Sequence, residues 1–225
     1  MQTKYAIMKQ SCHSGILSLL LLFLPIVSVA RAAVIFDNGI GVGGISSAVG
    51  SDPSANSTFR FMAEEFRPTS NATVTTVRWS GMYSPADTPT ATDSFTLIFY
   101  ADSLGLPGAV LNAFSVGDSV WRTDSTFDVL GYDIYSYTAA VNQPVVSGIN
   151  YWLSIVNDTT ADTNDSWLWG RDSRGVLARS SNQATWESFS LGNLDFALEG
   201  TVVPEPGTAT LLFGGLLCVL ARRRR

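Results

Sequence analysis

A chain of 225 residues, of which 46% are hydrophobic, 11% aromatic and 15% charged, is too apolar for an intrinsically disordered protein or a coiled coil. Its formal net charge of −5 is unevenly distributed, because residues 33–202 hold seven arginines against 18 of the 19 carboxylates, a net charge of −11. Such a surface repels phosphate, which excludes nucleic acid as a partner. The same residues include no Lys, His or Cys, which excludes a Ser-His-Asp triad, a Cys-His pair and a zinc site ligated by His or Cys.

The N-terminus has the three parts of a secretory signal peptide. Lys4 and Lys9 precede a leucine-rich apolar run over residues 15–30, and small residues then form A-x-A-like patterns that end at Ala30 and Ala32. The sequence therefore predicts a signal helix within residues 1–32, with cleavage after Ala30 or Ala32. An uncleaved membrane anchor is the alternative, because the apolar run is close to the shortest that spans a bilayer.

Residues 33–202 are predicted to be β-structure throughout, as one domain. Three runs rich in β-branched and aromatic residues are bounded by turn residues: 73–79, 94–100 and 151–156. Further candidate strands are 59–66, 109–116, 127–138, 166–170, 185–191 and 194–202. No window of the domain has a convincing helical stripe of apolar residues. These patterns predict an all-β fold, an antiparallel β-sandwich of jelly-roll type.

Two local signals predict irregularities within the domain. Gly131 lies inside the segment 127–138, where it predicts a β-bulge. Asn142, Gln143 and Pro144 are typical turn residues and predict a separator between two strands.

Calcium is the one cofactor that the sequence suggests. The segment 157–165 carries three Asp and two Asn, and a loop with several hard oxygen donors suits Ca²⁺. The candidate ligands are Asp158, Asp162, Asn164 and Asp165. The segment lacks the Gly and the distal Glu of an EF-hand loop, and a polar turn explains the same residues, so both interpretations stay open.

The aromatic residues suggest a carbohydrate-binding module. Nine of them could include a sugar-stacking platform or could instead fill the core of a domain without disulfides: Trp121, Trp152, Trp167, Trp169, Trp186, Tyr83, Tyr132, Tyr135 and Tyr137. Alternation places Trp167 and Trp169 on the same face of a strand, which favours the core.

A glycoside hydrolase would need two inward-facing carboxylates. Glu64 and Glu65 are adjacent, so in a strand they face opposite sides and cannot flank one bond. The other acidic residues lie mostly in turns, where a solvated surface role is the default. We therefore expect no enzymatic activity.

Residues 203–225 combine a proline-rich segment, a short apolar run and a basic end. Pro204, Glu205 and Pro206 stop the preceding strand. The run 208–221 would form a helix of ~21 Å, shorter than the ~30 Å hydrocarbon core of a bilayer. Four arginines close the chain and predict a stop-transfer signal that stays cytoplasmic: Arg222, Arg223, Arg224 and Arg225.

This order of parts resembles the PEP-CTERM protein-sorting signal. The resemblance implies a substrate of exosortase, a membrane-embedded cysteine transpeptidase of Gram-negative bacteria that would cut near Pro204–Pro206 and release or transfer the body. Such proteins often occur in species that make extracellular polysaccharide. The short transmembrane helix would then be a temporary tether, comparable to that of a GPI signal.

Several segments of the domain also resemble the body of many PEP-CTERM proteins of unknown function: 77–83, 93–102, 105–108, 148–155 and 167–169. This resemblance implies a β-sandwich and no activity. The sequence thus predicts an inner-membrane-tethered precursor that becomes a structural or adhesive protein of the cell surface or extracellular matrix. A module that binds extracellular polysaccharide is the alternative, and a glycoside hydrolase is a third hypothesis.

Overall fold

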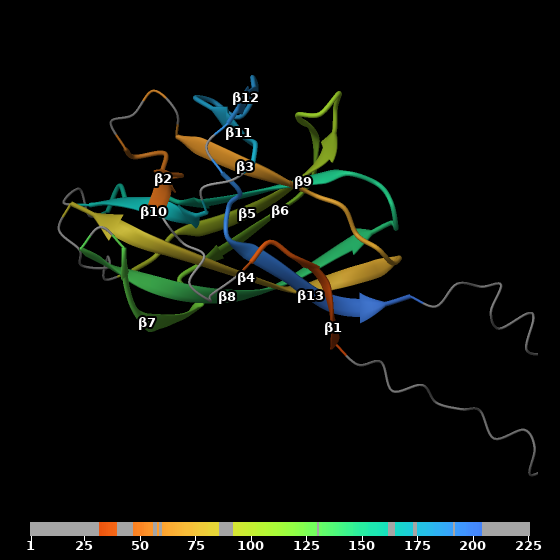
Figure 1. Cartoon of the computed structure of the whole chain (residues 1–225), viewed down its shortest axis with the longest axis horizontal. Helices are drawn as coiled ribbons and strands as arrows, with labels where there is room; N and C mark the ends of the chain where they lie inside the picture. Colours follow the sequence, from red (N-terminus) through yellow and green to blue (C-terminus); the bar gives the residue numbers. More distant parts are fainter. Residues whose placement is uncertain are drawn as a thin grey trace, which may run out of the picture. The chain divides into compact units, whose positions relative to one another are not determined.

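The computed structural model describes residues 32–39, 47–55, 58, 60–85, 92–129, 131–161, 165–172, 175–190 and 192–203. Every secondary-structure element in these ranges is a β-strand, and every strand pair is antiparallel (Figure 1). The predicted all-β antiparallel architecture is confirmed. The predicted signal helix and C-terminal helix lie outside the described residues, and the jelly-roll connectivity stays a prediction.

The first sheet, sheet A, is built around one long strand. Its strands are β1 (Ala32–Asp37), β2 (Ser47–Gly50), β4 (Ala72–Ser84), β7 (Trp121–Val129), β8 (Tyr132–Val145), β10 (Ser166–Arg171) and β13 (Phe196–Val202). Strand β4 pairs with β8 on one side, and its other side is shared between β13 and β10. Strand β7 lies beyond β8, β1 beyond β13 and β2 beyond β10.

The second sheet, sheet B, has six strands in the order β12-β11-β3-β9-β5-β6. Their bounds are β3 (Phe61–Phe66), β5 (Phe95–Asp102), β6 (Pro107–Gly117), β9 (Tyr151–Asn157), β11 (Leu177–Ser180) and β12 (Glu187–Phe189). Strand β9 lies at the centre, where it is buried along its whole length. A strand buried on both faces needs no polar alternation, which explains why five of its seven residues are hydrophobic.

Aromatic rings from the two sheets form the main core. The ring of Trp79 on β4 stacks on Tyr137 of β8 with 5.4 Å between centroids, and Phe95 of sheet B packs edge-on against Trp79 at 5.2 Å. Trp167 on β10 packs perpendicular to Phe95 at 5.1 Å. Each of these rings is at most 1% exposed, and burying a side chain of this size stabilises the fold by roughly 3 kcal/mol. The sandwich is therefore held together by ring packing, without disulfides.

A second, smaller core covers the outer face of sheet B. Tyr100 and Trp186 meet there in a T-shaped contact of 5.5 Å, and Trp152 of β9 packs in the same cluster. Trp186 lies just before β12 and is 8% exposed. The segment between β11 and β12 thus shields apolar residues on a face that would otherwise meet water.

The structure corrects both predicted irregularities. Gly131 lies in the turn between β7 and β8, where Val129 pairs with Tyr132, and its φ of 87° is a conformation that glycine readily adopts. Residues 142–144 do not separate strands, because they lie within β8 and Pro144 pairs with Thr73. Strand β7 pairs with β8 only as far as Thr138. In the described part of the chain β8 is therefore an edge strand at Pro144, where proline is tolerated.

Replacing Gly200 with alanine is expected to destabilise the sandwich. Gly200 lies on β13 next to a register shift, and a Cβ at this position would overlap the carbonyl oxygen of Thr73 and lie 2.9 Å from the Cα of Val74. Backbone atoms of a central strand cannot yield as a side chain can, so we expect a loss of about 3 kcal/mol in the free energy of unfolding. Urea denaturation of the exported protein, purified from producing cells, measures this loss.

Gly50 is the matched control. A Cβ there would meet only the Leu168 side chain at 3.7 Å, an ordinary van der Waals contact. Gly50→Ala should therefore change the free energy of unfolding by well under 1 kcal/mol. Equal effects at the two glycines would contradict the assigned register of β13 against β4.

Candidate functional site

The predicted calcium loop connects β9 and β10 and is described only in part. Asp158 is exposed, and its carboxylate accepts hydrogen bonds from the backbone N–H of Thr160, at 3.0 Å, and from the Thr160 hydroxyl. Asp165 is buried, and its carbonyl oxygen accepts from Oγ1 of Thr159 at 2.9 Å. Asp162 and Asn164 lie outside the described residues. No group of three His, Cys, Asp or Glu residues placed to hold a metal occurs in the described ranges, and the calcium site stays a prediction.

A carboxylate that the sequence did not single out holds this loop. Asp52 is fully buried, and its oxygens accept hydrogen bonds from the backbone N–H groups of Ser54 (2.8 Å) and Trp167 (3.0 Å). The hydroxyls of Ser54 and Thr159 both lie 2.6 Å from the same carboxylate. Asp52 thereby ties the loop after β9 and the start of β10 to the segment after β2. Its only local signal is that an Asp-Pro-Ser sequence is typical of a turn.

A second buried polar group joins the two sheets. Asp93 is 3% exposed and accepts from the Arg122 guanidinium at 2.8 Å, from Asn157 Nδ2 at 2.9 Å and from the Tyr83 hydroxyl. Tyr83 and Arg122 belong to sheet A, whereas Asn157 ends β9 of sheet B. Asn157 also accepts from the backbone N–H of Ser94 at 2.8 Å. These contacts tie the start of β5 and the end of β9 to sheet A.

Most of the candidate sugar-stacking aromatics belong to the core. Trp152, Trp167, Trp169, Trp186, Tyr83, Tyr135 and Tyr137 are all buried, and Tyr132 is half-buried. Trp121 on β7 differs from them, because 76% of its surface is exposed. The prediction that Trp167 and Trp169 share the inner face is confirmed, since both are fully buried. Of these nine residues, only Trp121 is exposed enough to stack on a sugar ring.

Two buried carboxyls lie where sheet A and sheet B meet near Leu194. Glu64 of β3 is 5% exposed, and its Oε2 accepts from the backbone N–H of Leu194 at 3.2 Å. Burial raises the pKa of Glu64 to about 8, and burial raises the pKa of Asp195 to about 7. Raised pKa values often mark catalytic acids. Here both carboxyls lie beneath the surface.

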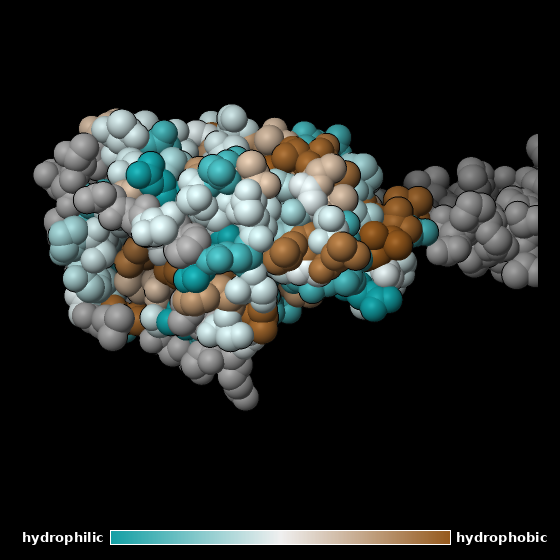
Figure 2. Space-filling view, turned by 90° about the horizontal axis from the view of Figure 1, so that it is seen from above, coloured by the Kyte–Doolittle hydropathy of each residue, from teal (hydrophilic) through white to brown (hydrophobic). Residues whose placement is uncertain are grey.

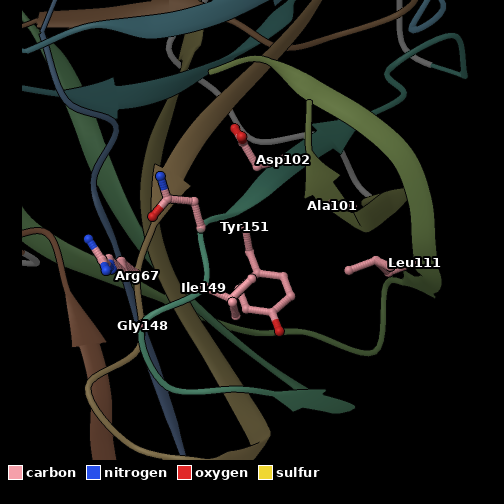
Figure 3. A pocket seen from close by; sticks show the side chains of 8 residues that line it. Arg67, Ala101, Asp102, Leu111, Gly148, Ile149 and Tyr151 are labelled. Atoms are coloured by element: carbon pink, nitrogen blue, oxygen red, sulfur yellow. The ribbon is translucent and has the colours of Figure 1, made fainter. Parts of the chain in front are cut away.

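A hollow of about 500 Å³ opens at one end of sheet B (Figure 3). It is lined by Arg67, Ala101, Asp102, Leu111, Gly148, Ile149, Asn150 and Tyr151. In Figure 3, Arg67 and Leu111 lie on opposite sides of the Tyr151 ring.

The polar groups of this hollow are partly engaged by the protein. Asp102 accepts from Trp152 Nε1 at 2.9 Å, and the Tyr151 hydroxyl accepts from the backbone N–H of Val146 at 3.0 Å. The exposed guanidinium of Arg67 could hold a small anion beside the aliphatic groups of Leu111 and Ile149. These residue types supply no nucleophile–base pair.

The exposed surface carries few large apolar side chains. On the face shown in Figure 2, hydrophobic residues form small groups between polar ones. The large exposed hydrophobic residues of the described ranges are Val34, Leu104, Val110, Leu111, Trp121, Val146, Ile149, Val176, Val202 and Val203. Trp121 is the only aromatic residue among them. Within the described residues, no helix has the length and hydrophobicity required to cross a membrane.

Comparison with known proteins identifies the C-terminal segment. Residues 202–225 match the model of the PEP-CTERM protein-sorting motif. No curated protein and no solved structure matches the chain. The motif confirms the predicted sorting signal and implies an exported, membrane-anchored precursor that exosortase processes in a Gram-negative bacterium. It says nothing of the role of the body.

Proposed function

We propose that this chain, which carries the PEP-CTERM sorting motif, is cut at both ends, so that its β-sandwich becomes a non-catalytic structural or adhesive protein of the cell surface or extracellular polysaccharide matrix. The observation that carries the proposal is the position of the motif. The last strand, β13, ends at Val202, and the backbone N–H of Val203 donates to the Asn71 carbonyl at 2.8 Å. Cleavage near Pro204–Pro206 therefore leaves every described strand intact.

The N-terminal boundary supports the same processing. Strand β1 begins at Ala32, which pairs with Thr201 of β13. Cleavage after Ala30 keeps this strand complete, whereas cleavage after Ala32 removes its first residue, so we favour Ala30. Because Ala32 and Thr201 are neighbours, both cuts fall at the same end of two paired strands. After both cuts, the two new chain ends therefore lie next to each other at one end of the β1–β13 pair.

A carbohydrate-binding module is the second candidate function. The exposed Trp121 favours it, because an indole ring in water offers a flat apolar surface for a sugar ring. A glycoside hydrolase would need two carboxylates that a glycan can reach, and the buried Glu64 and Asp195 do not supply them.

The intact mass of the protein tests the proposed processing. The protein is recovered from the envelope and medium of the native host and of a strain that lacks exosortase. We expect a mass without residues 1–30 and without the residues after about Pro204 in the native host, and a mass that retains the apolar run and the four arginines in the deficient strain. Retention of the C-terminal segment in both strains would overturn the processing and would make the protein a permanently tethered one.

A further inference from the structure

We propose that the outer face of sheet A around Trp121 binds a neutral polysaccharide chain. The proposal rests on the proposed location of the body outside the cell, and it assigns a ligand class and a surface to that body. The binding face is defined here as Trp121 and Thr123 on β7, Ser136 and Thr138 on β8, and Arg78 on β4.

The alternation of β7 places Trp121 outward. Arg122, the next residue, points into the sandwich and forms its ion pair with the buried Asp93. Trp121 and Thr123 therefore lie on the opposite, outer face. The indole Nε1 donates to Thr123 Oγ1 at 3.0 Å, a bond that restrains the ring although 76% of its surface is exposed. A ring held in advance loses little conformational entropy when a ligand stacks on it.

The strand registers continue this face across the sheet. Trp121 pairs with Thr138, Thr138 pairs with Arg78, and Thr123 pairs with Ser136. Directly opposite residues of an antiparallel pair point to the same side. The side chains from Trp121 to Arg78 thus span two strand spacings, ~10 Å. They present an apolar ring at one end and hydroxyl groups in the middle.

This combination of groups suits a sugar polymer. The C–H face of a pyranose ring is apolar and stacks on an aromatic ring, while its hydroxyls require both donors and acceptors. Serine and threonine hydroxyls act as both. Serine and threonine side chains are also short, so they leave room beside the tryptophan ring for an extended polysaccharide chain.

The charges of the surface favour a neutral chain over an acidic one. On the binding face, Arg78 is paired with Glu199 on β13 at 3.0 Å, which leaves the face locally neutral. The whole body has a net charge of −11, which repels uronate- or sulfate-bearing polymers. The hollow beside Arg67 offers a cation and would instead suit an acidic group, so the two surfaces predict different ligands.

The fluorescence of the exported protein tests this assignment, because Trp121 is the one exposed tryptophan of the six in the chain. Acrylamide should quench a fraction of the emission, and Trp121→Phe should remove that fraction. The probes are a soluble β-1,4-glucan, a soluble β-1,3-glucan, dextran, galactomannan and the neutral exopolysaccharide of the host, with alginate as the acidic polymer. We expect at least one neutral polymer to protect the quenchable fraction and alginate to leave it accessible.

Affinity electrophoresis of variants in gels that contain the same polymers provides the second measurement. Trp121→Ala should weaken binding roughly tenfold, the loss expected when about 1.4 kcal/mol of stacking disappears, and Trp121→Tyr should retain most of it. Val110→Ser is the matched control, because Val110 is 58% exposed on β6 of the other sheet.

Each possible result decides for or against the binding face. Loss of retardation in Trp121→Ala but not in Val110→Ser supports it. Two results of the electrophoresis overturn it: equal loss of retardation in both variants, or loss of retardation in Arg67→Ala instead of Trp121→Ala. It is also overturned if no neutral polymer retards the protein or protects its quenchable fluorescence. These measurements use purified protein, so their failure is distinct from a failure of exosortase processing, which the mass experiment detects.

Discussion

Replacing Asp52 with alanine is expected to lower the free energy of unfolding by about 4 kcal/mol, because a buried carboxylate and all its hydrogen bonds disappear together. Its oxygens lie within hydrogen-bond distance of three backbone N–H groups and two hydroxyls, those of Ser54, Thr159 and Trp167. Trp167 belongs to the aromatic core, so its unpaired N–H would be left where water has little access. Urea unfolding followed by tryptophan fluorescence at pH 7 measures the loss. Asp52→Asn, which keeps a carbonyl oxygen, should show a smaller one.

Asp158→Ala separates this effect from a general effect of removing an acidic residue. Asp158 is exposed, and its carboxylate bonds within its own turn, to Thr160, whereas its backbone N–H, which the substitution keeps, donates to the Ser94 carbonyl, so we expect a loss below about 1 kcal/mol. The same variant also tests the predicted calcium site. If Asp158 is a ligand, calcium should raise the melting temperature of the parent protein and not that of the variant. A loss at Asp158 equal to that at Asp52 in EDTA would contradict the role given to Asp52.

The strands that the sequence predicted well are those whose signal is local. The runs 73–79, 94–100 and 151–156 correspond to β4, β5 and β9, because buried strands require β-branched and aromatic residues over their whole length. Strands β2 and β11 have four residues each, too few for a pattern to emerge, and they form because longer neighbours pair with them. For these two strands prediction failed because pairing, and not the local sequence, determines where the strand forms.

The polar anchors show the same limit at the level of single residues. Asp52 meets Thr159 and Trp167, which are 107 and 115 residues away in the sequence. Nothing near Asp52 distinguishes it from the exposed aspartates of other turns. Likewise, the sequence left open which of the nine aromatic residues face water, because Trp121 lay outside the strands that the sequence predicted. The 76% exposure of Trp121 and the inward ion pair of Arg122 with Asp93 identify its outward direction.

Raising the pH should destabilise the sandwich through Glu64. Burial is the main cause that raises the pKa of this carboxyl to about 8, and the nearby Asp172 adds to it. An unfolded chain releases the proton near 4.5, the ordinary pKa of a glutamate side chain. Between these two values the folded state binds a proton that the unfolded state has released, so the free energy of unfolding falls as the pH rises. The shift corresponds to a loss of order 5 kcal/mol, complete above about pH 8.

Glu64→Gln isolates this contribution, because glutamine keeps a carbonyl oxygen for the Leu194 N–H and carries no charge at any pH. The variant should match the parent near pH 5 and exceed it in free energy of unfolding by several kcal/mol at pH 8 to 9. Burial raises the pKa of Asp195 to about 7. In the Glu64→Gln variant, the free energy of unfolding should therefore still fall with pH up to about 7, but less steeply than in the parent. Glu65→Gln is the control, since Glu65 lies on the opposite face of β3 and is half-buried. If Glu64→Gln and the parent lose stability in parallel from pH 5 to 9, the carboxyl of Glu64 is not held protonated, and water must reach it through the loops that precede Leu194.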